Sequence, residues 1–585
     1  MEYFIPLEKW FTGEPQMSKG HSEASMSFDR RGFLKTGLIT SAVTALSRSE
    51  FAAATQTNPA AQQALPPSSR SKVIMGQGDP RRTQAFAPLP YTNSDELTLA
   101  QGFSWYPLLR MGDVINAQGD TAGDCCDYLH FMPGRNAYQA FLWVNHEYVI
   151  DTVLYGKPVD GNSKTKAQVD HEMTLVGGSY VELTKERTKD GAERWKVKPN
   201  SVNAFRLSAH TPIAMVGPAG GRTALGTMAN CSGGYTPWGT ILTAEENFDV
   251  FYGTRANGFR SRYGWGKYYK RSELDYGWVV EVDPQTRAAR KLTALGRFAH
   301  ESATVTVAQD KRVVVYMGDD AKGECLYKFI SKNKLSGDPR KDADLLVEGQ
   351  LYVANLSRSE WISLSPDNPD LGRNKKFSVL KNILTYTREA AQLVGGTRLN
   401  RPEDIEVDPE TGDVYFTLTN FAEAGDPYGS LNLIREKNGD AASLHFEFET
   451  FLKGGLRSGV SCPDNLTFGP QNSLWVCTDM SASAMGKTSL ERFDRNSMFR
   501  VETDASGSVF ARHFLQAPRD AELTGPTFLP DGSGLLLSVQ HPGESSFSKK
   551  GIGYTSHWPD GGESKPVSTV VCVYPTDQNR ERFSR

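Results

Sequence analysis

The stretch from Asn400 to Asn420, NRPEDIEVDPETGDVYFTLTN, carries the pattern of a β-hairpin. Ile405 and Val407 alternate with polar residues, the middle is rich in Asp, Pro and Gly, and residues 414–418 are β-branched, aromatic or aliphatic. These features predict two strands joined by a turn. The strand pattern leaves three charged residues together at one end of the hairpin: Arg401, Glu403 and Asp404. Such an end is either an ordinary polar turn or part of a functional site.

Five other stretches of the chain follow the same plan. They are residues 127–131 with 141–147, 236–238 with 239–247, 300–303 with 313–320, 462–468 with 474–479, and 525–532 with 535–541. Each unit supplies strands that cannot bury their faces alone, and six units that close into a ring form a six-bladed β-propeller. We therefore predict an all-β fold, a six-bladed β-propeller with insertions and an N-terminal arm. A β-sandwich or two smaller β domains is the alternative.

The composition agrees with a globular β protein. Of the 585 residues, 39% are hydrophobic and 23% are charged, and the net charge is -3 with acids and bases interspersed, which argues against a nucleic-acid-binding surface. The 54 glycines and the many Tyr, Phe and Thr residues favour strands with frequent tight turns. The seven cysteines cannot all pair with one another and match no paired zinc pattern, so at least one thiol is free, buried or a metal ligand.

The N-terminal region reads as an export signal followed by a linker. Residues 27–35, SFDRRGFLK, form a twin-arginine motif, which is followed by a modest apolar stretch at 36–46 and small residues at 52–54. The apolar stretch is shorter than the roughly 20 residues that span a bilayer, so we expect no permanent membrane anchor. We predict an N-terminal extension and signal peptide at 1–54, a linker or arm at 55–95, and the propeller domain at 96–585. The twin-arginine export machinery transports folded proteins, often with a metal or cofactor already bound.

Acidic residues recur at equivalent positions of the repeats. The opening of each hairpin carries Asp127, Trp238, Glu301, Glu403 and Asp464, with Glu522 just before the last copy. The far ends carry Glu147, Glu246, Asp319 or Asp320, Asn420, Asp479 and His541. In a propeller these positions converge on the central channel, and both series are expected to face one mouth of it. Carboxylates held together raise one another's pKa unless cations intervene, and oxygen-rich sites suit calcium. The alternative is that the acids are strand-end residues of Asx-type turns.

Cys231 lies in the segment NCSGG (230–234), among small residues that would let a metal approach its thiolate. A thiolate beside carboxylates favours a transition metal alongside the harder ions. A lone cysteine can equally be a small buried hydrophobic residue.

The ordered motifs resemble the PhoX family of bacterial alkaline phosphatases over roughly residues 95 to 575. In addition to the twin-arginine motif they are NHEY (145–148), NCSGGYTPWGT (230–240), EEN (245–247), GRFAHE (296–301), YMGDD (316–320), RPED (401–404), CPDN (462–465) and QHPGE (540–544). The resemblance implies a periplasmic or secreted six-bladed propeller with an iron and calcium cluster, Fe3+ and Ca2+, that hydrolyses phosphate monoesters.

The same resemblance implies roles for individual residues. It places iron ligation on Cys231, Glu301 and Glu403. It places calcium ligation on acids that include Glu246 and Asp464, and metal ligation on Glu147 and Glu522. It places phosphate contact on Arg401 and Asn247.

The expected mechanism follows from the substrate. A phosphomonoester dianion needs charge neutralisation and an in-line oxygen nucleophile, and polynuclear metal sites supply both. We expect a metal-bound oxide or hydroxide as the nucleophile, with Arg401 clamping the phosphoryl oxygens, and Ser232 as a conceivable alternative nucleophile. The alternatives are a calcium-dependent propeller lactonase or esterase, and a non-catalytic binding module whose calcium stabilises the ring. The expected partners are small-molecule phosphate esters and the export machinery, and we expect a monomer.

Overall fold

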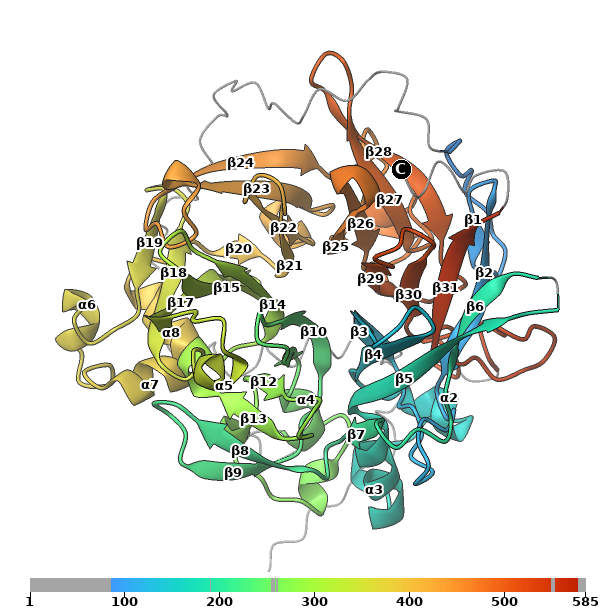
Figure 1. Ribbon diagram of the computed structural model, residues 1–585, viewed down its shortest axis with the longest axis horizontal. Helices are drawn as coiled ribbons and strands as arrows, with labels where there is room; N and C mark the ends of the chain where they lie inside the picture. The colour runs from blue at the N-terminus through green and yellow to red at the C-terminus, as the bar shows by residue number, and fades with distance from the viewer. Residues whose placement is uncertain (1–85, 190, 254–257, 259–260, 549–552, 577–585) are drawn as a thin grey trace, which may run out of the picture. The chain divides into compact units, whose positions relative to one another are not determined.

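The computed structural model describes residues 86–189, 191–253, 258, 261–548 and 553–576. Six β-sheets form a ring in which each sheet is one blade (Figure 1), so the predicted all-β, six-bladed propeller is confirmed. The twin-arginine motif and most of the predicted linker lie outside the described residues. No helix within the described residues is both long and apolar enough to cross a membrane.

The first three blades are built as follows. Blade 1 contains β3 (Cys126–Pro133), β4 (Gln139–His146), β5 (Gly177–Arg187) and β6 (Glu193–Val197), with β7 (Phe205–Leu207) paired to β5. Blade 2 contains β10 (Asn230–Tyr235), β11 (Ile241–Glu245), β12 (Val279–Val282), β13 (Ala289–Leu292), β8 (Pro212–Val216) and β9 (Arg222–Leu225). Blade 3 contains β14 (His300–Val307), β15 (Arg312–Asp319), β17 (Leu326–Lys334), β18 (Gly349–Asn355) and β19 (Glu360–Ser363).

The other three blades follow the same order. Blade 4 contains β21 (Pro402–Val407), β22 (Val414–Leu418), β23 (Ser430–Glu436) and β24 (Phe446–Lys453). Blade 5 contains β25 (Pro463–Gly469), β26 (Ser473–Thr478), β27 (Ser497–Thr503), β28 (Val509–Gln516) and β1 (Thr98–Leu99). Blade 6 contains β29 (Leu523–Phe528), β30 (Leu535–Val539), β31 (Thr569–Pro575) and β2 (Phe103–Arg110). A separate pair joins β16 (Lys322–Glu324) to β20 (Leu399–Asn400).

The helices lie in the connections between strands. They are α2 (Asp151–Tyr155), α3 (Lys166–Leu175), α4 (Asp249–Tyr252), α5 (Pro339–Asp342), α6 (Pro369–Gly372), α7 (Leu380–Thr385) and α8 (Thr387–Leu393). Short 3-10 turns are η3 (Gly161–Ser163), η4 (Trp265–Lys267), η5 (Glu273–Asp275), η6 (Thr293–Leu295), η7 (Ala422–Ala424), η8 (Lys437–Gly439), η9 (Pro470–Asn472) and η10 (Thr488–Leu490).

Two strands from early in the chain complete blades 5 and 6. β2 pairs antiparallel with β31, so a strand that precedes blade 1 in the sequence becomes the outer strand of blade 6. β1 pairs with β28 in the same way on blade 5. Ahead of β1, Phe86 packs against Phe514, and the Leu89 N–H donates to the His513 carbonyl (2.9 Å). These pairings tie the two described ends of the chain into neighbouring blades and close the ring.

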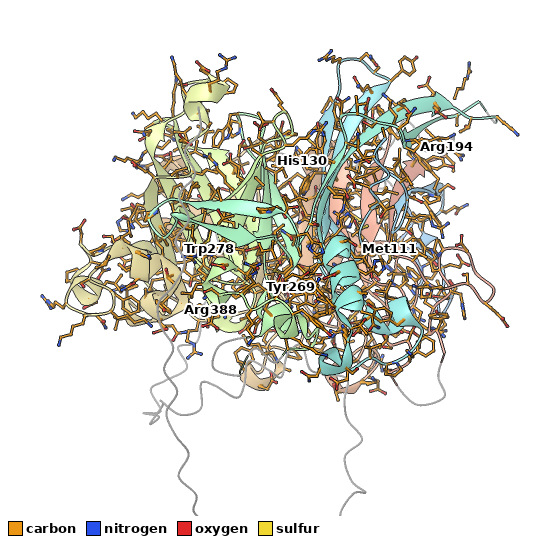
Figure 2. All side chains as sticks on the ribbon, turned by 90° about the horizontal axis from the view of Figure 1, so that it is seen from below. Met111, His130, Arg194, Tyr269, Trp278 and Arg388 are labelled. Atoms are coloured by element: carbon orange, nitrogen blue, oxygen red, sulfur yellow. The ribbon has the colours of Figure 1, made fainter. Side chains whose placement is uncertain are left out.

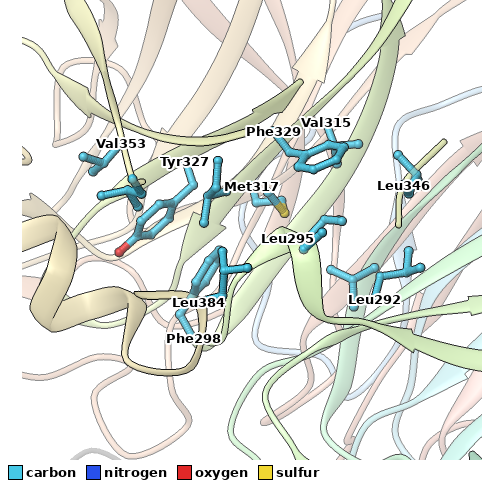
Figure 3. Packing of buried hydrophobic residues seen from close by; sticks show 14 of the residues in the cluster. Leu292, Leu295, Phe298, Val315, Met317, Tyr327, Phe329, Leu346, Val353 and Leu384 are labelled. Carbon is cyan, nitrogen blue, oxygen red and sulfur yellow. The ribbon is translucent and has the colours of Figure 1, made fainter. Parts of the chain in front are cut away.

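Apolar side chains fill every interface between blades. Members from the two blades at each interface include, in order around the ring, Trp143 and Ile241, Leu242 and Val315, Tyr316 and Phe416, Tyr415 and Val476, Trp475 and Leu537, and Leu536 and Val144. Figure 3 shows the interface between blades 2 and 3, where Leu292 and Leu295 approach Val315, Met317 and Phe329. Strands that pack on both faces need near-continuous apolar runs, which is why β22 and β30 are buried at every residue.

The hairpin of blade 2 differs from its prediction. The stretch Thr236–Trp238 was expected to open the hairpin, but residues 236–240 form its turn and the inner strand is β10. Trp238 donates from Nε1 to Glu281 Oε1 (3.0 Å) within the blade, away from the start of the hairpin. The residue that opens this hairpin, at the position of Glu301 and Glu403, is therefore Cys231.

The cysteines and the connections complete the picture. All seven cysteines are free and buried. The turns within the inner hairpins are short, whereas the connections from β4 to β5, from β11 to β12 and from β30 to β31 span residues 147–176, 246–278 and 540–568. Figure 2 shows Tyr269, in the second of these connections, lower in the view than His130 of β3, and so nearer the opposite face of the ring. Because β4, β11 and β30 are equivalent strands of their blades, the described parts of the three long connections start at the same face of the ring, and functional residues often lie in such loops.

Candidate metal centre

The inner hairpin of every blade has the same irregularity. Its register shifts by one residue near the start of the inner strand, between Cys126 and Leu129, Asn230 and Gly233, Glu301 and Thr304, Pro402 and Ile405, Pro463 and Leu466, and Thr524 and Thr527. A β-bulge of this kind bends the strand and re-aims the side chains beside it. Six bulges at one level of the ring therefore place equivalent side chains around its centre (Figure 1).

The second residue of each inner strand carries a metal-type donor in five of the six blades. In order of blade these residues are Asp127, Cys231, Glu301, Glu403, Asp464 and, without such a donor, Thr524. The first residue after each partner strand forms a second series: Glu147, Glu246, Asp320, Thr419, Asp479 and Gln540. In all six blades its N–H donates to the carbonyl of the residue just before the inner strand, at 2.8 to 3.1 Å. Both series therefore lie at the same end of the hairpins.

The second series corrects the predicted strand ends. Asp320 occupies the equivalent position, whereas the Asp319 carboxylate pairs with Arg388 (Oδ2 to Nε, 2.8 Å). The equivalent residues in blades 4 and 6 are Thr419 and Gln540, where the sequence pattern indicated Asn420 and His541.

Two groups of donors are close enough to hold metal ions. The donor atoms of Cys231, Glu246 and Glu301 lie within 4.8 Å of one another, and so do those of Glu301, Glu403 and Asp464. The Cys231 Sγ lies 2.7 Å from Glu301 Oε2. Because Glu301 belongs to both groups, the two candidate positions are adjacent.

Further acids surround these groups. Gln540 Nε2 donates to Asp127 Oδ2 (2.7 Å) and to Glu147 Oε2 (2.8 Å), and the Glu147 and Glu246 carboxyls interact directly. Glu522 interacts with the Asp464 carboxyl and lies 3.2 Å from His541 Nε2. We call the whole set the axial cluster: Asp127, Glu147, Cys231, Glu246, Glu301, Asp320, Glu403, Asp464, Asp479 and Glu522.

Arg401 is the arginine that contacts this cluster. Its Nε and Nη2 donate to the two carboxylate oxygens of Asp320, both at 2.8 Å, and Nη2 also lies 2.8 Å from Glu403 Oε1 and 3.6 Å from Asp479 Oδ2. The Arg401 side chain is 20% exposed and that of Asp479 is 23% exposed, whereas Glu403 is 4% exposed. Arg401 also has a positive φ of 58°, which fixes the hairpin end from which the side chain extends. The guanidinium therefore lies at the solvent-accessible edge of the cluster.

Burial and mutual repulsion dominate the electrostatics. Burial raises the pKa of Glu147 to about 8, and burial together with neighbouring carboxylates raises the pKa of Glu246 and Asp464 well above the usual value. Burial and then Glu301 raise the pKa of the Cys231 thiol in the same way. Asp320 is the exception: burial raises its pKa, but Arg401 together with hydrogen bonds to Glu246 and Glu403 holds the pKa below the usual value. Two like charges about 4 Å apart repel by roughly 4 kcal/mol at an effective dielectric constant of about 20.

The donor set fits a mixed metal centre. Clustered carboxylates are ligands for hard cations such as calcium, and a thiolate among them favours a transition metal such as iron. Gln540 Oε1 is buried and has no hydrogen-bond partner among the described residues, so it is an oxygen that a cation would satisfy. Cations would also relieve the repulsion among the acids.

The predicted site residues come together in the structure. Cys231, Glu246, Glu301, Glu403 and Asp464 form the two donor groups, and Glu147 and Glu522 lie beside them in the axial cluster. The two predicted phosphate contacts, Arg401 and Asn247, lie at its edge, where Asn247 Nδ2 donates to Glu246 Oε1 (2.5 Å). Ser232, the alternative nucleophile, uses its Oγ in a structural contact: the oxygen accepts the N–H of Ser302 from blade 3 (2.5 Å).

The sequence pattern did not single out every polar residue of the site. The pattern includes Gln540 only as part of the motif QHPGE, and it does not distinguish Asp320 from Asp319. Their common signal is their position one residue beyond a strand, which becomes clear once the strand ends are known.

Comparison with known proteins adds independent findings. A family model for alkaline phosphatase PhoX matches residues 84–543. The chain is similar to the solved structure of Pseudomonas fluorescens PhoX in complex with vanadate, a transition state analogue, with 28% identity and a TM-score of 0.75, covering 86% of this chain and 99% of that chain. It is also similar to the iodide structure of the Trichoderma reesei carbohydrate-active enzyme of family AA12, with 10% identity and a TM-score of 0.34 over 83% of this chain and 100% of that chain. A search of curated proteins finds no match.

Proposed function

The chain belongs to the PhoX alkaline phosphatase family, and from that membership we propose that it hydrolyses phosphate monoesters and releases inorganic phosphate at the axial cluster. The observation that supports this assignment best is the pair of donor groups that share Glu301, Cys231–Glu246–Glu301 and Glu301–Glu403–Asp464. A calcium-dependent lactonase or a calcium-stabilised binding module would give the Cys231 thiol no role.

We propose that Fe3+ and Ca2+ occupy this cluster. Cys231, Glu301 and Glu403 would hold iron, as the family resemblance implies. Glu301 supports this set because its donor atoms belong to both groups, one with Cys231 and one with Glu403. Glu246 and Asp464 would hold calcium, with Glu147 and Glu522 as further ligands. When bound, the ions would neutralise the carboxylates and the phosphoryl group and supply the oxygen nucleophile.

Arg401 and Asn247 would bind and orient the phosphoryl group. Asp320 and Glu403 occupy Nε and Nη2 of Arg401, so its Nη1 would donate to a phosphoryl oxygen at the accessible edge of the cluster. Asn247 Nδ2 donates to Glu246 Oε1 in the structure, and it would donate to a phosphoryl oxygen once Glu246 binds a cation. The vanadate bound by Pseudomonas fluorescens PhoX is a transition-state analogue, which supports a phosphoryl-transfer role for the corresponding site here.

The burial of the cluster would strengthen these interactions. Glu301, Glu403 and Asp464 are 3%, 4% and 5% exposed, so they lie in a water-poor environment in which fixed charges act strongly. The described parts of the connections after β4, β11 and β30 begin at Glu147, Glu246 and Gln540, beside the cluster, and would limit access to small esters. We therefore propose small-molecule phosphate esters as substrates.

We also propose that the protein is exported through the twin-arginine pathway and acts as a monomer in the periplasm or outside the cell. The proposal rests on the motif at residues 27–35 and on the family. Export of a folded chain would also keep all seven buried cysteines free in an oxidising compartment.

One assay tests the activity. The full-length metal-loaded protein is incubated at alkaline pH with a chromogenic phosphate monoester, and in parallel with a lactone, before and after chelation. We expect phosphate release that chelation abolishes and that calcium restores at least in part. No phosphate release, or hydrolysis of the lactone alone, would contradict the proposal.

Metal analysis tests the role of the thiolate. We expect Cys231→Ala to lower the iron-to-protein ratio of the purified protein, whereas Cys572→Ala in β31, also buried and free, leaves it unchanged. Equal iron content in both variants would rule out ligation by Cys231.

A further inference from the structure

The third residue of each inner strand lies inside the bulge, next to the metal-type donor. In order of blade these residues are Tyr128, Ser232, Ser302, Asp404, Asn465 and Gly525. Several of them bond to a neighbouring blade: the Ser302 N–H donates to Ser232 Oγ (2.5 Å), and the Gly525 N–H donates to Asn465 Oδ1 (2.7 Å). Polar links therefore join the blades directly beneath the axial cluster.

Asp404 makes the most extensive of these links. Its Oδ1 accepts the hydroxyl of Ser302 in blade 3 and the N–H of Ile405 in its own blade (2.8 Å). Its Oδ2 accepts the N–H of Leu466 in blade 5 (2.8 Å). One carboxylate therefore spans three consecutive blades. Ser302 also accepts the Ile405 N–H (2.8 Å), so the hydroxyl and the carboxylate hold the same strand.

The three blades that Asp404 joins are those that supply one donor group. Glu301 directly precedes Ser302, Glu403 directly precedes Asp404, and Asp464 lies two residues before Leu466. Any change in the spacing of these three strands would change the distances among the donor atoms, which now lie within 4.8 Å of one another.

Such a tie is needed because the donors repel. When fewer cations are bound, the three buried carboxyl groups either repel one another or take up protons, and the ligand geometry must still be ready for the incoming ion. Ser302 is held at φ 68°, a conformation that a residue other than glycine adopts rarely and that suggests a functional constraint. The Ser302 side chain is completely buried, so its hydroxyl is shielded from water where it meets the Asp404 carboxylate.

We propose that Asp404 is a positioning residue of the metal centre, which holds blades 3, 4 and 5 at the separation that Glu301 and Glu403, as iron ligands, and Asp464, as a calcium ligand, need to bind adjacent cations. The inference rests on the proposed metal ligation by these three residues. Asp404 itself contacts no substrate or metal in this assignment and acts through the strands that carry the ligands.

Calcium retention provides the test. Full-length holoenzyme is dialysed against a series of chelator-buffered calcium concentrations, and the free calcium at which half of the bound calcium is lost is measured by elemental analysis. Groups that orient metal ligands typically change metal affinity by about 10- to 100-fold when mutated. We expect Asp404→Asn to raise the free calcium concentration at which half of the bound calcium is lost by about this factor. The asparagine NH2 group would replace one carboxylate oxygen and face a backbone N–H, so one hydrogen bond between blades would be lost.

The control separates positioning from general stability. Thr304 Oγ1 donates to the Ile405 carbonyl (2.5 Å) and so joins blades 3 and 4 beyond the bulge. We expect Thr304→Val to lower the thermal unfolding midpoint much as Asp404→Asn does, but to leave calcium retention unchanged. An equal shift in calcium retention in both variants, or no shift in Asp404→Asn, would overturn the proposal.

Two further variants keep the outcomes distinct. If Asp404→Asn does not fold, Ser302→Ala removes one of its links, and calcium retention must shift in the same direction for the proposal to hold. Glu403→Gln tests the ligand assignment itself. If Glu403→Gln leaves both the iron and the calcium content unchanged, the proposed ligand set fails and the positioning role fails with it; if only Asp404→Asn is without effect, the positioning role alone is wrong.

Discussion

Glu245 and Glu246 are consecutive buried acids in opposite environments. The Glu245 carboxylate accepts Lys291 Nζ (2.6 Å) and two backbone N–H groups, those of Gly277 and Trp278. Glu246 lies among Glu147, Glu301 and Asp320, and an Asn247 amide is its nearest donor. A buried acid with a matched lysine serves the fold, whereas a buried acid among other acids requires a cation from outside the chain.

The same contrast runs through the whole ring. Lys328 of blade 3 pairs with Glu436 of blade 4 at 2.9 Å, and Lys164 lies 2.8 Å from Glu172 and 3.2 Å from Asp151 in the connection between β4 and β5; all five side chains are buried. The axial cluster has nine acids, and Arg401 is the one arginine or lysine that forms a salt bridge with it among the described residues. Structural acids are therefore neutralised within the fold, and the charge imbalance is concentrated at the candidate metal centre.

The largest effect is expected at the pair of neighbours. Glu245→Gln leaves the Lys291 ammonium buried without its carboxylate, so we expect the free energy of unfolding to fall by about 3–5 kcal/mol. Glu246→Gln removes one repelling charge, so the metal-stripped protein should become more stable while the holoenzyme loses metal. Urea unfolding of the stripped proteins and metal analysis measure both effects. If both Glu245→Gln and Glu246→Gln lower the stability of the metal-stripped protein, the two glutamates do not have the opposite roles assigned to them.

The neighbouring residues Asp319 and Asp320 allow a second comparison, between the two arginines that bind them. Arg401 binds Asp320 in the cluster, whereas Arg388 binds Asp319 outside it. We expect Arg401→Ala to lower kcat/KM by about 100- to 1000-fold, because a donor to the transferring phosphoryl group is lost, with metal content and folding of the holoenzyme near normal. Arg388→Ala should instead lower stability and leave kcat/KM close to that of the parent protein. Steady-state kinetics that show the reverse order would exclude the assigned role of Arg401.

The pH dependence of stability should differ between the stripped and the loaded protein. Burial raises the pKa of Glu147 from 4.5 to about 8 in the folded metal-free chain. A folded pKa above the unfolded value stabilises the protein below pH 4.5, and this contribution is lost as the pH rises through 8. The thermal midpoint of the stripped protein should therefore fall over this range, and Glu147→Gln should flatten the decline. A loaded protein with the same slope would mean that the acids do not bind the metal.

The smallest effect is expected at Trp238, which the sequence pattern placed at the hairpin opening. Trp238→Phe removes its hydrogen bond to Glu281, so we expect a loss of about 1 kcal/mol of stability. Metal content and kcat/KM should not change, because the residue lies in the turn of the blade 2 hairpin. A change in metal content in Trp238→Phe would show that Trp238 does contribute to the metal centre.

Much of the fold is readable from the hairpins. The predicted strands around Ile405 and Val414 match β21 and β22, because alternating and β-branched residues beside an Asp-Pro-Gly turn have few other stable solutions. The predicted start of the blade 2 hairpin is wrong because β10 begins with Asn-Cys-Ser-Gly-Gly, a segment without the usual strand residues. That strand is held by its neighbours Leu242 and Thr243 and not by its own propensity.

The roles of individual site residues could not be predicted from the strand pattern in the same way. Asp319 and Asp320 are indistinguishable in the sequence, yet they face Arg388 and Arg401 respectively, because successive residues of an extended chain point to opposite sides. Asp404 was grouped with Glu403 at the hairpin end, but the bulge turns its carboxylate toward blades 3 and 5. Composition and spacing do not reveal where a bulge lies.

Strand patterns and residue types are local properties, so the six repeats, the family resemblance and the chemical character of the donors can be read from the amino-acid sequence. Which donors meet depends on how the ring closes. Ring closure by β2 and β31 brings residues as distant as Asp127 and Gln540 within hydrogen-bonding distance, and six bulges set which neighbour in each strand faces the centre. A shift of one residue reverses the direction of a side chain, so only the three-dimensional register separates a ligand from its neighbour.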